Sequence, residues 1–140
     1  MIIVYLLLLV IPSAPRNAIA TFVNQSAVEI RWLSPLVTGY SSHVFYEVEC
    51  RKSCGIDDEN NCVEKSCSSD VNYEPHREGL NVTQVIVTNL EPFINYTFKV
   101  YALNRVSEVA NRKHGVGGNF TMITLRTSGT GELALQVSVS

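Results

Sequence analysis

The feature that most constrains the fold of this 140-residue chain is a series of short segments in which apolar and polar residues alternate. In Ala27–Leu33 (AVEIRWL), Val28, Ile30 and Trp32 fall on one side, with charged residues opposite. Successive side chains of a strand point to opposite faces, so this period of two predicts a strand with one buried face. We expect Trp32, the only tryptophan, on that buried face.

Similar segments recur along the chain and predict further strands. Turn residues such as Ser34-Pro35 separate them, and no helical period persists over ten residues. In the last segment apolar residues fall on both sides, so its facing stays open. The pattern predicts an all-β, seven-stranded, immunoglobulin-like antiparallel sandwich. The segments that we interpret as strands are residues 19–23, 27–33, 44–51, 83–90, 96–104 and 119–127.

A leucine, a proline and a tyrosine occur together at the start of segment 96–104. Leu90, Pro92 and Tyr96 have the layout of a tyrosine corner, in which the hydroxyl bonds back to upstream backbone and fixes the crossover between two sheets. An ordinary core tyrosine is the alternative. We favour the corner because the three residues arrive together.

The N-terminal segment is apolar from Ile2 to Ile11, which is too short to span a bilayer and fits the apolar part of a secretory signal. No Lys or Arg precedes this run, and the best cleavage pattern, Ala18-Ile19-Ala20, falls inside the first expected strand. Residues 1–11 are therefore either a signal peptide or a truncated start. We expect the domain at residues 12–127 and a polar tail or linker stub at residues 128–140.

Four N-x-S/T sequons favour passage through the secretory pathway and predict N-glycosylation. The net charge of −2 and the lack of a basic run give no support for binding of nucleic acid or of anionic lipid. We therefore expect an extracellular or cell-surface protein with protein partners, without nucleic acid and without a small-molecule substrate. The sequon asparagines are Asn24, Asn81, Asn95 and Asn119.

All four cysteines lie between Cys50 and Cys67, in the stretch CRKSCGIDDENNCVEKSC. A zinc site needs four tetrahedral thiolates and usually takes each pair as C-x2-C, whereas the pairs here are C-x3-C and C-x4-C. A thioredoxin-like redox motif also needs C-x-x-C, which is missing. We favour disulfides, and a small four-cysteine zinc module remains an alternative.

The spacing of the cysteines suggests how they pair if segment 44–52 returns as a hairpin. Opposed residues of a hairpin sum to a nearly constant number, and Cys50 with Cys67 sums to 117 while Cys54 with Cys62 sums to 116. One bulged residue brings both pairs into opposition. Four cysteines allow three connectivities, of which we favour the nested bonds Cys50–Cys67 and Cys54–Cys62, stapling an insert after the third strand.

Several stretches together carry a resemblance to a known family: PSAPRN at 12–17, YEVEC at 46–50, VNYEP at 71–75, YTF at 96–98 and ALNRVSE at 102–108. With the expected buried Trp and the corner, residues 12–127 resemble a fibronectin type III domain. The two cysteine pairs before the V-x-Y-x-P segment make the chain similar to the first fibronectin type III domain of Eph (ephrin) receptor tyrosine kinases. That family more often has C-x2-C in both pairs, so the pairing stays open.

The resemblance implies a non-catalytic extracellular module, acting as a glycosylated spacer and interaction domain in an Eph-like receptor ectodomain for cell-surface signalling or adhesion. Its implied partners are neighbouring receptor domains or lateral receptor contacts, with a membrane only through a parent receptor. It carries no ligand-contact residue onto this chain. A secreted or generic cell-adhesion protein of the same fold is the alternative.

No arrangement of catalytic residues is recognisable in the sequence. His43, His76 and His114 are scattered, none accompanies a Ser or Cys nucleophile in a known motif, and no glycine-rich phosphate loop occurs. We therefore expect no enzyme activity, no cofactor and no metal.

Overall fold

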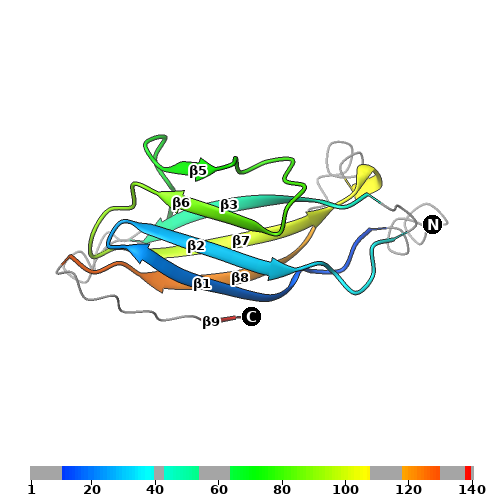
Figure 1. Cartoon of the computed structure of the whole chain (residues 1–140), viewed down its shortest axis with the longest axis horizontal. Coiled ribbons are helices and arrows are strands. Elements are labelled where there is room, and N and C mark those ends of the chain that lie inside the picture. Colours follow the sequence, from blue (N-terminus) through cyan, green and yellow to red (C-terminus); the bar gives the residue numbers. More distant parts are fainter. Residues whose placement is uncertain (1–10, 40–42, 54–63, 108–117, 130–137, 140) are drawn as a thin grey trace.

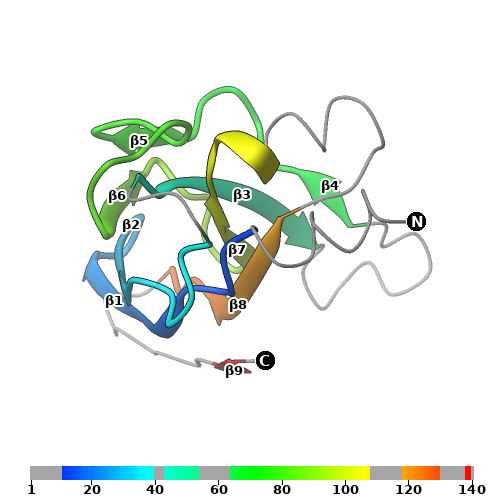
Figure 2. The same cartoon turned by 90° about the vertical axis from the view of Figure 1, so that its right-hand side faces the viewer.

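Two antiparallel β-sheets packed face to face make up the computed structural model of the chain (Figure 1). The structure describes residues 11–39, 43–53, 64–107, 118–129 and 138–139. Viewed from the end, the two sheets form separate layers (Figure 2). Among these residues, no helix has the length and apolar character needed to cross a membrane. The predicted all-β sandwich is confirmed.

The first sheet has four strands in the order β1-β2-β6-β5, all antiparallel to their neighbours. Its longest ladder joins β1 (Arg16–Asn24) to β2 (Ala27–Leu33). The other two strands are β6 (Gln84–Thr88) and the short edge strand β5 (Asn72–Glu74).

The second sheet has five strands in the order β4-β3-β7-β8-β9. Its centre is formed by three long strands: β3 (Phe45–Ser53), β7 (Asn95–Leu103) and β8 (Asn119–Arg126). Two-residue strands lie at the edges: β4 (Lys65–Ser66) and β9 (Ser138–Val139). The described sandwich thus has seven strands of three to nine residues and two strands of two residues.

The core lies between the inner faces of the two sheets and is formed by the apolar residues of the alternating segments, as the sequence predicts. Trp32 is buried, and its ring meets Tyr46 of the opposite sheet edge-on, with centroids 5.4 Å apart. Strand β2 has the bounds that its alternation predicts, and its Val28 and Ile30 are fully buried. Burying each such side chain contributes roughly 1.5–3 kcal/mol before the entropy cost of folding.

The structure settles the facing of β8, which the sequence left open. Ile123 and Leu125 are buried in the core, whereas Phe120 and Met122 belong to the outer face of the five-stranded sheet. Apolar residues on both sides of this strand therefore serve two different surfaces.

Three differences from the expected segments exceed shifts of one or two residues at strand ends. β1 begins at Arg16 rather than at residue 19. Residues 72–74, expected within a polar connection, form β5 because Tyr73 and its neighbours pair with β6. Within the expected tail 128–140, Ser138–Val139 pairs with β8.

Candidate interaction surface

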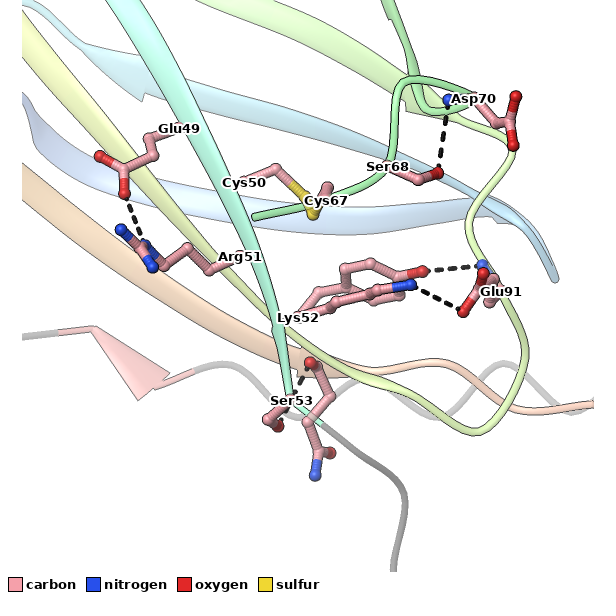
Figure 3. The surroundings of a disulfide bond; sticks show 11 residues. Glu49, Cys50, Arg51, Lys52, Ser53, Cys67, Ser68, Asp70 and Glu91 are labelled. Atoms are coloured by element: carbon pink, nitrogen blue, oxygen red, sulfur yellow. Dashed lines mark hydrogen bonds and ion pairs between the residues drawn. A yellow bond between two sulfur atoms is a disulfide. The ribbon is translucent and has the colours of Figure 1, made fainter. Parts of the chain in front are cut away.

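A disulfide joins Cys50 of β3 to Cys67, which directly follows β4 (Figure 3). The two Cα atoms are 5.5 Å apart, and the Cys67 N–H donates to the Cys50 carbonyl oxygen at 3.1 Å. β3 and β4 pair Arg51 with Ser66 and Lys52 with Lys65, each pair summing to 117. The residue numbers of Cys50 and Cys67 have the same sum, so the disulfide follows the register of the hairpin.

The remaining pair, Cys54 and Cys62, lies outside the described residues, and its bond stays a prediction. The Cys50–Cys67 bond uses two of the four thiolates that a zinc site in this stretch needs. In the part of the chain that the structure describes, no cluster of three or more His, Cys, Asp or Glu side chains is placed to hold a metal.

The turn before β7 has the geometry of a tyrosine corner. The hydroxyl of Tyr96 accepts a hydrogen bond from the backbone N–H of Glu91 at 2.8 Å, and both Tyr96 and Leu90 are buried. Pro92 is exposed in the same turn. Burial raises the pKa of Tyr96 above its ordinary value, because the charged form would lose its solvation.

Lys52 ties the disulfide hairpin to this corner. Lys52 lies opposite Tyr96 in the ladder of β3 and β7, and its Nζ is 3.2 Å from Glu91 Oε2 (Figure 3). The Glu91 side chain is half exposed, so the pair contributes little energy, typically about 0–1 kcal/mol. Its effect is to orient the base of the hairpin against the corner.

Thr127 is a structural residue that the sequence reasoning missed. It is 1% exposed, and its Oγ1 donates to the Glu91 carbonyl at 2.6 Å and accepts from the Ile94 N–H at 3.1 Å. Its backbone N–H donates to the Ile94 carbonyl, and its carbonyl accepts from the Phe93 N–H. The side-chain hydroxyl, the backbone N–H and the carbonyl of Thr127 are therefore all hydrogen-bonded to the turn before β7.

The outer face of the five-stranded sheet carries an ordered group of aromatic and charged residues. Strand register places Glu47 of β3 opposite Tyr101 of β7, and Tyr101 opposite Phe120 of β8. We call these three residues the Tyr101 row. The rings of Tyr101 and Phe120 have centroids 5.2 Å apart, and the Lys99 ammonium lies 4.9 Å from the Phe120 centroid.

Hydrogen bonds fix the side chains around the Tyr101 row. The Tyr101 hydroxyl donates to Glu49 Oε2 at 3.0 Å, and Arg51 Nε donates to Glu49 Oε1 at 2.9 Å. Burial and the bond to Glu49 raise the pKa of Tyr101 to about 12. The hydrogen bond from Arg51 lowers the pKa of Glu49, whereas burial and nearby Glu78 raise the pKa of Glu47.

The four sequon asparagines are all exposed. Asn95 and Asn119 stand at opposite ends of the ladder of β7 and β8. Asn24 lies at the Asn95 end, because the carbonyl of nearby Ser26 accepts a hydrogen bond from the Leu90 N–H. Asn81 lies at the Asn119 end, because the preceding residue, Leu80, is bridged to Tyr46, which pairs with Ala102.

The histidines singled out in the sequence do not come together in the described part of the chain. His43 is exposed and near the Phe45 ring, with centroids 6.4 Å apart. His76 is exposed, and its Nδ1 lies 2.6 Å from the Glu78 carbonyl oxygen. His114 lies outside the described residues.

Comparison with known proteins gives matches that agree with this geometry. The family model of the fibronectin type III domain matches residues 13–114. Ephrin type-A receptor 3 of Danio rerio is 42% identical over 100 residues, which cover 71% of this chain and 10% of that protein. Ephrin type-A receptor 5 of Homo sapiens is 37% identical over 99 residues, covering 71% of this chain and 9% of that protein. The chain thus spans about a tenth of the length of these relatives.

A solved structure of chicken CNTN1 FN1–FN3 domains has a TM-score of 0.51 and 17% identity, covering 85% of this chain and 33% of that chain. This likeness concerns the fold alone. The predicted resemblance to Eph receptor fibronectin domains is confirmed by the relatives. The match over residues 13–114 and the two-sheet sandwich show that this chain belongs to the fibronectin type III family.

Proposed function

We propose that this chain is a non-catalytic extracellular module, of the kind found in Eph receptor ectodomains, which acts as a spacer and as an interaction domain. One observation carries the proposal: a domain 37–42% identical to ephrin receptors holds the Cys50–Cys67 disulfide in the register of its own hairpin. Disulfides persist in oxidising compartments and are rare in the cytosol, which favours an extracellular or cell-surface location.

The spacer role is supported by residues 12 and 127, which lie at opposite ends of the sandwich. Asn119 Nδ2 donates to the Pro12 carbonyl at 2.8 Å, so residue 12 lies at the start of β8. Thr127 lies beyond the other end of β8, at the corner. A nine-residue strand such as β7 is about 30 Å long, so the module separates whatever precedes it from whatever follows it by roughly this distance.

N-glycosylation at Asn24, Asn81, Asn95 and Asn119 is part of the proposal. Exposure of all four side chains in the folded domain supports it, because a glycan on a buried asparagine would not fit. The glycans would stand at the two ends of the sandwich and leave the middle of both sheets open.

The Tyr101 row supports an interaction role better than a catalytic one. Two of its side chains are engaged by neighbours outside the row: the Tyr101 hydroxyl by Glu49 and the Phe120 ring by Lys99. Aromatic side chains in fixed positions are typical of binding surfaces, since little entropy is lost when they are covered. A secreted or general cell-adhesion module is the second candidate, and the same surface would serve it.

Expression in secreting cells behind a heterologous leader tests the extracellular assignment. We expect a mobility shift with N-glycosidase and a shift with reductant, and mass mapping should recover a peptide that joins Cys50 to Cys67. Secreted protein with four free thiols, bound zinc and no glycan would overturn the proposal in favour of the zinc module.

A further inference from the structure

The Tyr101 row has a charge pattern that is complementary to itself. Glu47 stands at its β3 end, the Tyr101 ring at its centre, and at its β8 end the Phe120 ring with the Lys99 ammonium 4.9 Å from its centroid. Lys99 belongs to β7, but its contact with Phe120 brings the positive charge to the β8 side. From β3 to β8 the row thus has the acid Glu47, then the Tyr101 ring, then the Phe120 ring, with the neighbouring Lys99 cation beside Phe120.

Consider a second copy related to the first by a two-fold axis. The axis runs parallel to β7 and lies between the two facing sheets. β3 of one copy then lies above β8 of the other, while positions along the strands are kept. Tyr101 meets Tyr101, and Glu47 of each copy meets the Lys99–Phe120 pair of the other. Sheets commonly pack face to face with strands within about 30° of each other, so the long strands of this sheet suit the arrangement.

Three further observations fit a covered rather than a solvated face. Phe120 is 40% exposed although it is a large apolar side chain, and Met122 lies beside it on the same strand. Among the described residues, no hydrogen bond or ion pair holds the Glu47 carboxylate. Burial and Glu78 raise the pKa of Glu47 and Arg77 offsets this only in part, so a cation from a second copy would further favour the charged form.

We infer that the outer face of the five-stranded sheet, centred on Tyr101, is a self-association surface that binds a second copy of this module through two Glu47–Lys99 pairs around a Tyr101–Tyr101 contact. This rests on the proposed function as an interaction module and names its partner. A twofold contact is isologous, so each copy supplies both halves of every pair. The contact depends on pairs of opposite charge at an exposed face, which indicates a weak, salt-sensitive dimer.

The sequons leave this surface accessible. Asn95 is six residues from Tyr101 along β7, about 20 Å away. Asn119 directly precedes Phe120, but it shares the alternation of the buried Thr121 and not that of Phe120, and its Nδ2 donates to the Pro12 carbonyl oxygen. A glycan at Asn95 would lie away from the contact, and a glycan at Asn119 would border it at the end of the sandwich.

Charge reversal tests the pairing by sedimentation equilibrium of the full chain, with its disulfide intact, from micromolar to millimolar concentration. Glu47→Lys and Lys99→Glu each place like charges opposite one another twice in a homodimer. We expect each variant alone to weaken self-association about tenfold or more. In an equimolar mixture of the two variants both contacts become attractive, so a heterodimer should form with nearly the affinity of the unchanged chain.

A matched control reverses a charge on the opposite sheet. Arg31 of β2 is exposed and pairs with Glu29 on the outer face of the four-stranded sheet, so Arg31→Glu should leave self-association unchanged. Circular dichroism and the fluorescence of buried Trp32 should be the same in all variants, which shows that they fold.

Monomer at every concentration would overturn the inference, as would association that neither charge reversal weakens. Weakening by each variant without recovery in the mixture would overturn the specific pairing of Glu47 with Lys99. Any of these results leaves the proposed extracellular module standing, because glycosylation and the disulfide are measured separately. If the secreted protein contained neither the disulfide nor a glycan, the proposed function would be wrong, and the measured self-association would be unaffected by that result.

Discussion

The hydroxyl of Tyr96 lies 2.8 Å from the backbone nitrogen of Glu91 and accepts its hydrogen bond. Through the same turn, Glu91 also binds Lys52 by its carboxylate and Thr127 by its carbonyl oxygen. The corner thus joins three strands of one sheet, β3, β7 and β8, at the end where the disulfide hairpin begins. Substitutions at Tyr96 and Thr127 therefore test how much this corner contributes to the free energy of unfolding.

Tyr96→Phe should lower the free energy of unfolding by about 1–3 kcal/mol, because the part-buried Glu91 N–H loses its acceptor. Urea denaturation followed by Trp32 fluorescence measures it. The control is Tyr73→Phe in edge strand β5, a half-buried tyrosine near Tyr96 that makes no hydrogen bond to the Glu91 turn among the described residues, so removal of its hydroxyl should cost less. Equal losses in the two variants would contradict the corner's contribution.

Thr127→Val keeps the shape of the side chain and removes its hydroxyl. The Glu91 carbonyl and the Ile94 N–H then lose their partner inside the protein, so we expect a loss of about 1–3 kcal/mol. Thr124→Val, on the outer face of β8, is the matched control and should change stability by less than about 0.5 kcal/mol. Chemical denaturation of both variants decides the point.

Removal of the disulfide should destabilise the domain without changing its fold. Cys50 and Cys67 are 17 residues apart in sequence, and a loop of this size corresponds to about 3 kcal/mol in the chain-entropy treatment. We expect the double variant Cys50→Ala, Cys67→Ala to unfold at a lower urea concentration. Reductant should then lower the midpoint of the unchanged chain more than that of the variant. An unchanged midpoint in the double variant would show that the bond adds no stability.

Alkaline titration tests the environment of Tyr101. Its pKa is raised from 10.0 to about 12 in the folded chain, so the stability linked to this shift is fully present below pH 10. That stability is lost as the pH rises through about 12, because the ionised phenol is not tolerated beside Glu49. Between pH 10 and 12 the unchanged chain should therefore lose more stability than Tyr101→Phe does.

The measurement is the unfolding midpoint of both proteins against pH, together with tyrosinate absorbance. Other buried tyrosines also have raised pKa values, so only the difference between the two proteins reports Tyr101. The same slope in both would contradict the assignment of the bond from Tyr101 to Glu49.

Local patterns in the sequence predicted the parts of the fold that depend on local information. The alternation in AVEIRWL gave the bounds of β2 and the burial of Trp32, because a strand with one buried face leaves a period of two. Arithmetic within one expected hairpin favoured the pairing of Cys50 with Cys67, which the structure contains. Both inferences need only residues close together in the chain.

Features that depend on long-range register could not be predicted in this way. Glu47, Tyr101 and Phe120 become neighbours only when β3, β7 and β8 align, and nothing in the separate strands states that alignment. Thr127 looks like any polar residue at a strand end until Glu91 and Ile94 surround it. Strand β5 has only three residues, too few for alternation to be recognised.

The placement of residues 12 and 127 at opposite ends of the sandwich has a mechanical consequence. A force that pulls these two points apart draws β1 and β8 in opposite directions along their own axes. The hydrogen bonds that hold β1 to β2 and β8 to β7 then lie across the direction of tension and share the load in shear. Rupture requires many of them to break together, so the module would transmit a pull between its neighbours rather than unzip under it.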